Sequence, residues 1–273
     1  MQKEVTTYLD LVKRWDIFLN KINARFQEAL IMAKEAIMNN LVESDYDMTQ
    51  TSLAWSGIKA QIQNLSDKIE QTFEEKVKPQ MLQYKKEYEI LEEYQKGLAL
   101  SETFYSKIER FQIELEGEIG LKFYNHAIRF LNENFKCTQC GAQLQINKNI
   151  FRAQYVSCNY CNTVNTFMPN AKVSEIKWHI IDKIARYKSI NEYDAMIEAQ
   201  NQFNSLRMPA DNEDKTEIKQ VLKKREITEK AYWNKFFTER NKYFDEDTND
   251  VKRYIENKMK YFYAEQQRIL NNQ

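Results

Sequence analysis

Turn-forming residues, histidine and long apolar runs are all scarce in this 273-residue chain. It contains 5 glycines, 3 prolines and 2 histidines, and its longest uninterrupted apolar run is the five residues from Ala29 to Ala33. The glycines are scattered, which argues against a glycine-rich phosphate-binding loop. Because a membrane-spanning helix needs roughly 20 apolar residues, we expect no transmembrane segment.

The first residues of the chain also lack the apolar region of a secretory signal peptide. The segment from Met1 to Tyr8 contains no apolar stretch, and the whole chain balances 40 basic against 40 acidic side chains. We therefore expect a cytoplasmic location, where disulfides are rare. The even mixture of charges argues against the basic face that anionic lipids select, and hence against a membrane-associated helical protein.

Catalytic arrangements of side chains are missing as well. His126 and His179 each lie within a helical pattern, and neither is spaced from a serine, cysteine or carboxylate in a recognised catalytic motif. We expect both histidines to be structural or surface residues. The sequence therefore predicts that the protein is not an enzyme.

The residues that are abundant predict a helical protein. Charged residues make up 29% of the chain and hydrophobic residues 42%, with 15 Phe and 16 Tyr among them. A polar chain with few turn residues and enough apolar material for a core is typical of long helices packed side by side. We predict a mainly α fold of long antiparallel, coiled-coil-like helices.

A heptad pattern marks the first of these helices. Its apolar positions follow one another in alternating steps of four and three, which is the spacing of a coiled-coil seam. Such a stripe cannot be buried by one helix alone, so it requires neighbouring helices, and exposed seams leave homo-oligomerisation open. The seam consists of Tyr8, Val12, Trp15, Leu19, Ile22, Phe26, Ala29, Ala33 and Ala36.

About five further helices are expected along the chain. The second should begin between Ser52 and Ser56 and kink at Pro79, where consecutive four-residue steps indicate a shift of register. After Gly97 a third helix should run from about Ser101 to residue 136. Breaks near Pro209 and residues 245–250 divide the helices that follow residue 171.

The four cysteines form two pairs near the middle of the chain, Cys137-Thr-Gln-Cys140 and Cys158-Asn-Tyr-Cys161. The spacing C-x2-C-x17-C-x2-C is typical of structural zinc modules, in which four thiolates surround the ion at about 2.3 Å. Gly141 and Asn162 follow the pairs, and both residue types tolerate the left-handed conformation that such turns need. We predict one structural Zn²⁺ bound by Cys137, Cys140, Cys158 and Cys161.

Three other chemistries use similar cysteine patterns. Disulfides require an oxidising compartment, and a redox dithiol uses one CxxC at a helix N-terminus beside a βαβ pattern, so neither fits this chain. Iron suits the same four-thiolate geometry. The sequence favours zinc but leaves iron open, and four cysteine ligands leave no coordination position for a substrate.

The helical pattern gives way to alternation of apolar and polar residues around the cysteines. Residues 142–146 and 151–155 alternate on either side of a turn at 147–149, which predicts a hairpin, and residues 163–167 could add a third strand. The motifs Cys137-x-x-Cys140-Gly141-Ala142-x-Leu144 and Val156-x-Cys158-x-Tyr160-Cys161-x-Thr163-x-Asn165 resemble the zinc-ribbon modules with rubredoxin-like knuckles.

This resemblance covers residues 137–170 and implies that the four cysteines bind zinc. Many members of the group have proline after the first cysteine, where this chain has Thr138. Zinc ribbons occur in transcription factors, ribosomal proteins, enzymes and scaffolds, so the resemblance implies a metal and a local fold but no single activity.

Three parts are predicted for the whole chain. An N-terminal helical arm of about three helices spans residues 1–135, the zinc ribbon spans 136–170, and a C-terminal helical arm of about three helices spans 171–273. The ribbon lies between two helices that should run antiparallel, at the tip of a helical hairpin. Residues 137–170 contain only Lys148 and Arg152 as charged side chains.

The predicted function is that of an intracellular protein-interaction or scaffold component with unidentified protein partners. The alternative is a nucleic-acid-binding factor, in which Phe151, Arg152, Tyr155 and Tyr160 would stack on single strands. The same aromatic residues could instead form the small core of the ribbon. Uncharged amides fit a protein-facing surface better than a phosphate-facing one, and the ribbon is rich in them: Gln139, Gln143, Gln145, Asn147, Asn149, Asn159, Asn162 and Asn165.

Overall fold

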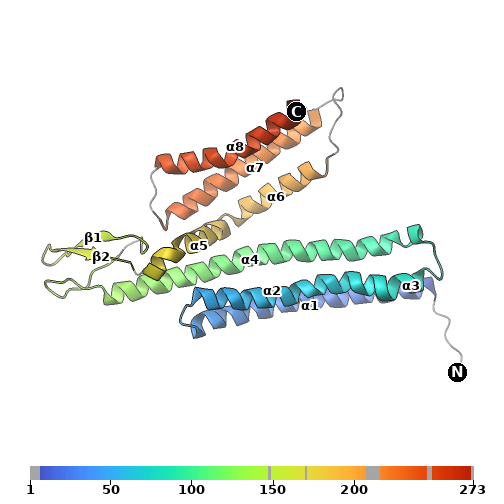
Figure 1. Ribbon diagram of the computed structural model, residues 1–273, viewed down its shortest axis with the longest axis horizontal. Helices are drawn as coiled ribbons and strands as arrows, with labels where there is room; N and C mark the ends of the chain where they lie inside the picture. The colour runs from blue at the N-terminus through green and yellow to red at the C-terminus, as the bar shows by residue number, and fades with distance from the viewer. Residues whose placement is uncertain (1–6, 147–148, 170, 207–215, 245–247, 272–273) are drawn as a thin grey trace. The chain divides into compact units, whose positions relative to one another are not determined.

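The chain is mainly α-helical in its computed structural model, which describes residues 7–146, 149–169, 171–206, 216–244 and 248–271 (Figure 1). Helices account for 79% of the chain, and the strands of the described residues form a single two-stranded antiparallel sheet. The predicted mainly α fold is confirmed. No helix among the described residues is both long and apolar enough to cross a membrane.

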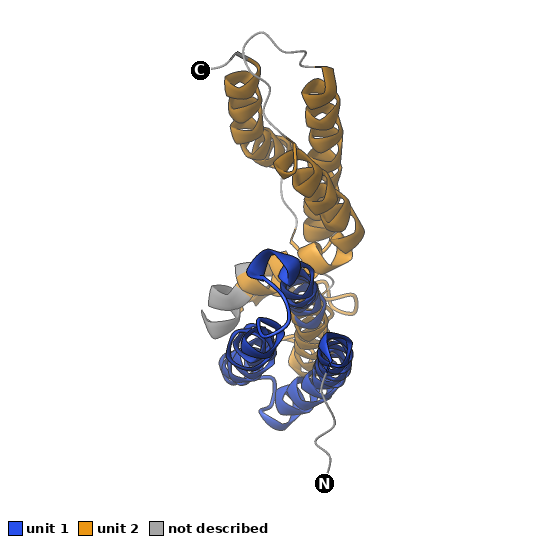
Figure 2. Cartoon of the chain, turned by 90° about the vertical axis from the view of Figure 1, so that its right-hand side faces the viewer, with its two compact units in different colours: residues 1–115 blue, residues 116–273 orange. Residues whose placement is uncertain are grey.

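Two compact units divide the chain, residues 1–115 and residues 116–273 (Figure 2). The division falls inside the long helix α4 (Leu91–Asn134), whose first part belongs to unit 1 and whose second part belongs to unit 2. The three-part organisation with boundaries near residues 136 and 170 remains a prediction.

Unit 1 is built from three long helical segments. They are α1 (Tyr8–Glu43), α2 (Met48–Thr72) with its continuation through a π-helical turn (Phe73–Val77) into α3 (Lys78–Met81), and the first part of α4. Trp15 donates its indole N–H to the carbonyl of Glu93 at 3.0 Å, and Phe26 stacks on Phe104 with ring centroids 3.9 Å apart. Residue numbers therefore rise together along α1 and α4, which run parallel.

Helix α2 runs antiparallel to α4. Trp55 meets Phe111 with ring centroids 5.5 Å apart, and Phe73 meets Tyr94 at 5.4 Å. These contacts pair rising residue numbers on one helix with falling numbers on the other. Unit 1 is therefore an up-down-up arrangement, and the core between the three segments is mostly aromatic and aliphatic.

The heptad seam predicted for α1 is buried in its middle but not at its ends. At the N-terminal end Leu11 is buried, whereas the predicted seam residue Val12 is only half-buried. At the C-terminal end Ile37 is buried, whereas the predicted seam residue Ala36 is exposed. An α-helix with 3.6 residues per turn drifts by about 20° per heptad. The buried stripe therefore moves to the neighbouring residues over the length of this helix.

The predicted start of the second helix is wrong. Helix α2 begins at Met48 rather than between Ser52 and Ser56, because the side chain of Asp47 caps it by accepting hydrogen bonds from the amides of Thr49 and Gln50 at 2.8 and 3.0 Å. An N-cap carboxylate of this kind satisfies amides that would otherwise lack partners.

The predicted break at Gly97 and helix start at Ser101 are also wrong, because α4 already begins at Leu91 and passes through both residues. A Cβ atom at position 97 would lie 2.9 Å from Cζ2 of Trp15. Glycine therefore occurs here because two helices approach closely. The kink expected at Pro79 remains a prediction, but a π-helical turn (Phe73–Val77) lies just before this residue, which itself belongs to α3.

Unit 2 contains the rest of α4, a small sheet and four helices. The strands are β1 (Gln154–Ser157) and β2 (Val164–Phe167), and the helices are α5 (Ala171–Lys188), α6 (Ile190–Asn204), α7 (Thr216–Asn241) and α8 (Thr248–Asn271). Helix α7 contacts α5, α6 and α8. The chain thus has more helical segments than the six predicted, and the break expected at Pro209 lies outside the described residues.

Two glycines bring α4 and α5 together. A Cβ on Gly117 would collide with Tyr187, and one on Gly120 would lie 3.0 Å from Cγ1 of Ile184. The residue number increases from Gly117 to Gly120 on α4 while that of the contacted residue decreases from Tyr187 to Ile184 on α5. The two helices that flank the cysteine region therefore run antiparallel at this contact.

The predicted hairpin is wrong in its pairing. Residues 142–146 form no strand and make a single bridge between Lys136 and Gln143, whereas β1 pairs with β2 from Gln154 opposite Phe167 to Ser157 opposite Val164.

Candidate metal centre

Each cysteine pair is folded by the same set of backbone hydrogen bonds. The amide of Cys137 donates to the carbonyl of Ala142 at 2.7 Å, and the amide of Cys158 donates to the carbonyl of Thr163 at 2.9 Å. In both turns the residue after the second cysteine donates back to the first cysteine. That residue has a positive φ in both turns, as predicted: 72° for Gly141 and 57° for Asn162.

The two turns place four sulfur atoms together. All four Sγ atoms lie within 4.8 Å of one another, with Cys137 3.5 Å from Cys161 and Cys140 3.6 Å from Cys158. A tetrahedron with metal–sulfur bonds of about 2.3 Å has edges of about 3.8 Å. The four cysteines predicted as ligands are therefore clustered in positions that suit a structural metal ion.

Asn165 on β2 connects the cysteine cluster to both turns. Its side-chain oxygen accepts a hydrogen bond from the amide of Thr138 at 2.9 Å, and its Nδ2 lies 3.6 Å from Sγ of Cys137 and donates to the carbonyl of Thr163 at 3.0 Å. Asn165 is buried. The prediction that it belongs to an exposed amide-rich surface is therefore wrong.

Thr138 explains one departure from the zinc-ribbon pattern. Its backbone N–H makes the bond to Asn165, and its hydroxyl donates to the same oxygen at 3.0 Å. Proline, which is frequent at this place in the modules that the segment resembles, has no N–H to donate. Thr138 therefore provides a second tie between the first turn and β2.

The surroundings of the sulfurs favour bound cations. Amide hydrogen bonds, first that of Cys140, together with the side chain of Asn165 outweigh burial and lower the pKa of Cys137 to about 6. A hydrogen bond from the backbone amide of Ala142 also favours the thiolate of Cys140. The three neighbouring sulfurs and burial outweigh it and raise the pKa of Cys140 to about 12. Four thiolates cannot accumulate at this spacing without a positive ion among them.

A small core supports the cluster from one side. Buried Cys137, Leu144 and Cys158 pack with Phe135 and Val156. The ring of Phe135 also meets that of Phe167 edge-on, with centroids 5.8 Å apart. The period-two alternation of β2 therefore sends Asn165 and Phe167 inward and leaves its other residues on the outer face.

The four residues proposed as nucleic-acid contacts differ in their burial. Phe151 is buried, whereas Arg152 is exposed and its guanidinium lies 4.0 Å from the ring centroid of Phe244, in the turn after α7. Tyr155 and Tyr160 are 79% and 82% exposed. Only Phe151 therefore belongs to the protein's own core, whereas Arg152 and the two tyrosines are exposed.

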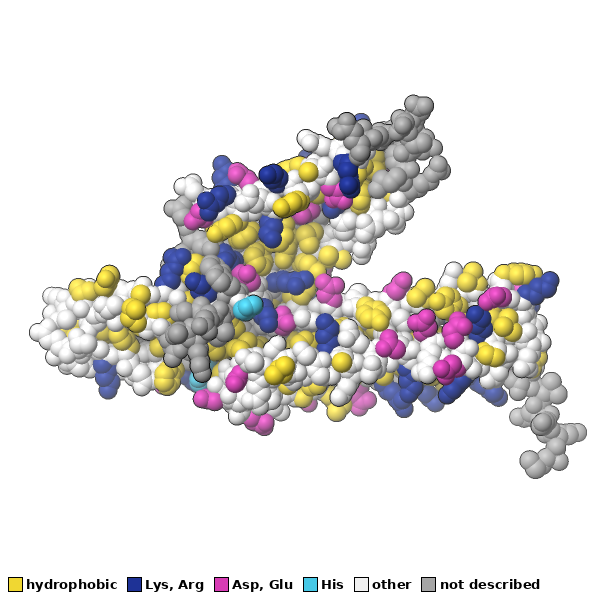
Figure 3. All heavy atoms as spheres, in the orientation of Figure 1, with side chains coloured by type: hydrophobic (Ala, Val, Ile, Leu, Met, Phe, Trp, Pro, Cys, Tyr) yellow, Lys and Arg dark blue, Asp and Glu magenta, His cyan; other side chains and the backbone are white. Residues whose placement is uncertain are grey.

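An exposed face with little charge covers the outside of the sheet. Tyr155 on β1 and Val164 on β2 point outward, and Tyr160 and Met168, which lie beyond the strands, are exposed as well. White and yellow spheres predominate over the β1–β2 region in Figure 3. We call Tyr155, Tyr160, Val164 and Met168 the ribbon face.

The histidines stay apart from this cluster. His126 lies on α4 and His179 on α5, and within the part of the chain that the structure describes, only the four cysteines form a group of His, Cys, Asp or Glu side chains suited to a metal ion. No family model, curated protein or solved structure matches this chain. The resemblance to zinc ribbons therefore rests on the cysteine motifs and the geometry of their turns.

Proposed function

We propose that the four cysteines bind one structural Zn²⁺ and that residues 136–170 form a zinc ribbon. The close cluster of four sulfurs, built from two turns with the same hydrogen bonds, is the observation that carries this proposal. The zinc ion folds a head too small to be held by its own apolar core, and structural zinc contributes on the order of 10 kcal/mol to such modules. In a reducing cytoplasm the thiols remain available to the metal.

The proposed role of this head is to bind another protein, with helical arms of residues 1–135 and 171–273 packed in a coiled-coil-like manner as its support. The ribbon face supports this role because its exposed side chains are aromatic and aliphatic, as in the centres of protein interfaces. Arg152, the one charged side chain among the described residues of 137–169, lies against Phe244. Phosphate contacts would require more positive charge.

Photo-crosslinking in cells of the native organism tests the proposal. We expect a crosslinker placed at Val164 to capture a defined protein, and capture to be lost when Tyr155 and Tyr160 are both changed to serine. Tyr261→Ser is the matched control, since this tyrosine of α8 is as exposed as Tyr160. Equal capture by the Tyr155→Ser/Tyr160→Ser variant would count against the ribbon face.

A binding assay distinguishes the nucleic-acid alternative from the proposed binding of a protein. Labelled single-stranded oligonucleotides are titrated with the zinc-loaded protein at low salt, where phosphate contacts are strongest. We expect no binding that depends on the two tyrosines. Binding that weakens with salt and disappears in the Tyr155→Ser/Tyr160→Ser variant would favour the alternative, in which those rings stack on bases.

A further inference from the structure

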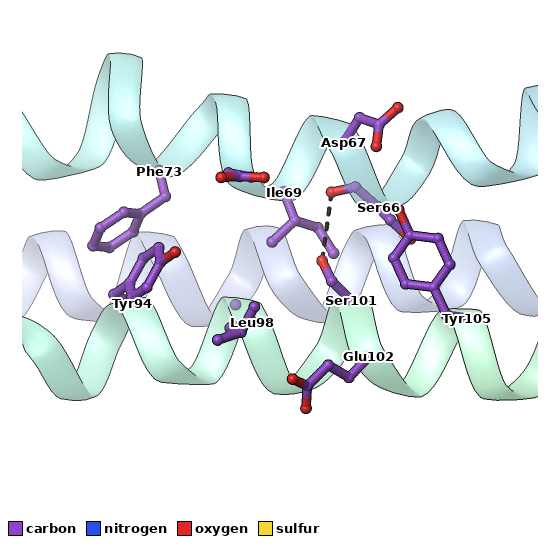
Figure 4. A pocket seen from close by; sticks show the side chains of 11 residues that line it. Ser66, Asp67, Ile69, Phe73, Tyr94, Leu98, Ser101, Glu102 and Tyr105 are labelled. Atoms are coloured by element: carbon purple, nitrogen blue, oxygen red, sulfur yellow. Dashed lines mark hydrogen bonds between the residues drawn. The ribbon is translucent and has the colours of Figure 1, made fainter.

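A narrow cleft lies between α2 and the first part of α4 in unit 1 (Figure 4). Ile69 and Gly97 contribute to its lining, Phe73 and Tyr94 stand at one end, and the ring of Tyr105 rises from α4 toward α2 at the other. Its volume is about 120 Å³. Since a cavity of roughly 150 Å³ accepts benzene, this cleft has room for one slender side chain and no room for a helix.

Negative charge surrounds the cleft. Asp67 and Glu70 on α2 and Glu102 on α4 line it, and none of the three forms an ion pair with another residue of the described chain. In Figure 4 Asp67 and Glu102 lie on opposite sides of the cleft, and Figure 3 shows acidic side chains gathered among hydrophobic ones over α2 and α4. Ser66, 3% exposed, also lines the cleft, and its hydroxyl has no hydrogen-bond partner.

The adjoining cleft shows which group fits such surroundings. It shares Phe73 and Tyr94 with the first cleft and holds Lys78 of the chain itself. The ammonium of Lys78 lies 3.2 Å from Glu74 and 3.1 Å from Glu87. In this part of unit 1, carboxylates beside an aromatic wall therefore hold an ammonium group on an aliphatic stem, and the first cleft offers the same surroundings without a lysine.

We propose that the cleft lined by Asp67, Glu70 and Glu102 binds a lysine side chain of a partner polypeptide. The methylene stem would lie along Ile69 and Leu98, and the ammonium would meet the carboxylates and the face of an aromatic ring. Leu98 and Tyr105 at the rim are 46% and 49% exposed, which gives apolar contact for the residues beside the lysine. This extended surface favours a polypeptide over a free polyamine.

Calorimetric titration of the full-length, metal-loaded protein tests this proposal. The probe is a blocked peptide in which leucines flank a central lysine, and the comparison peptide carries norleucine in place of the lysine. We expect the norleucine peptide to bind at least about tenfold more weakly, because it lacks the charge. A Glu70→Gln/Glu102→Gln variant should lose about tenfold in affinity for the lysine peptide.

Glu92→Gln is the matched control, since Glu92 is an exposed carboxylate of α4 outside the cleft. It should leave binding unchanged, and circular dichroism should show all variants folded because the substituted side chains are exposed. Absence of binding, equal binding of the norleucine peptide, or an equal loss in Glu92→Gln would overturn the proposal. Binding of spermidine as tightly as the peptide would overturn the choice of a polypeptide. This site lies in unit 1, so its test is independent of the zinc proposal.

Discussion

Asn165 is the side chain whose hydrogen bonds join the two cysteine turns. Because it contacts Thr138, Thr163 and the sulfur of Cys137, we predict that Asn165→Leu weakens zinc affinity ten- to a hundredfold, as loss of a group that orients a metal ligand typically does. Competition with a coloured chelator measures the affinity. Asn159→Leu, at an exposed position between the second pair of cysteines, is the control, and equal affinities for both variants would show that Asn165 has no such role.

Residues whose backbone conformation is special could be identified from the sequence, whereas residues defined by a distant contact could not. The spacing of the cysteines and the positive φ of Gly141 and Asn162 follow from the local geometry of a CxxC turn. Asn165 bonds to a residue 27 positions away. The one local signal was its place in β2, where it shares the inward face with Phe167.

Alanine substitutions at Gly97 and Gly57, two glycines inside helices, should change the free energy of unfolding in opposite directions. Both lie inside helices, but a Cβ at position 97 would lie 2.9 Å from the Trp15 ring, whereas one at position 57 would meet nothing within 4 Å. We predict that Gly97→Ala lowers the free energy of unfolding by about 1–3 kcal/mol through overpacking. Gly57→Ala should raise it by about 0.5–1 kcal/mol, since alanine favours the helix.

Urea denaturation of the two glycine variants measures these free energies. Because both substitutions add the same methyl group to a helix, the difference in sign isolates the effect of the helix contact. A Gly97→Ala variant as stable as Gly57→Ala would contradict the close approach of α1 and α4.

Arg225 ties three helices of unit 2 together. It lies on α7, pairs with Glu265 of α8 at 2.8 Å, and its guanidinium is 5.1 Å from the ring centroids of Phe203 on α6 and Phe262 on α8. We predict that Arg225→Ala destabilises the protein by about 1–3 kcal/mol, through lost packing and a carboxylate left without its partner. Thermal unfolding measures the effect.

The neighbouring Lys224 supplies the control for Arg225. Its side chain is half-exposed and pairs with a largely exposed Glu198, so Lys224→Ala should change stability by less than about 1 kcal/mol. If both variants unfolded at the same temperature, Arg225 would not hold the three helices together.

The presence of helices could be predicted from the periodicity of apolar residues. The positions where helices end or are interrupted could not. A helix break was expected at Gly97, because the residues around it in the sequence do not indicate that the distant Trp15 ring packs against this position. The second helix was expected to start between Ser52 and Ser56, although the carboxylate of Asp47 caps α2 at its start. The four-residue steps through Ile69, Phe73, Val77 and Met81 did indicate a change of register, and the structure has a π-helical turn at Phe73–Val77.

On the scale of the whole molecule, the cluster of four cysteines lies in unit 2 alone. We predict that Cys158→Ser abolishes zinc binding and the order of β1 and β2, while most helical circular dichroism remains, because unit 1 has its own core. Treatment of the unmodified protein with a strong chelator should have the same effect. Global unfolding of the variant would show that the metal supports more than the ribbon.

Composition predicted the mainly α fold and the cysteine motifs predicted the cluster of four cysteines, but the sequence could not reveal how the helices pair. A heptad stripe such as that from Trp15 to Phe26 shows that a helix face will be buried, and not which helix will cover it. The parallel packing of α1 and α4 depends on contacts between residues almost 80 positions apart.

X-ray absorption at the metal edge of the purified protein tests the proposed zinc site. We expect one zinc ion per chain, surrounded by four sulfur atoms at about 2.3 Å. An iron edge, a first shell containing nitrogen or oxygen, or a protein that folds its ribbon without any metal would contradict it.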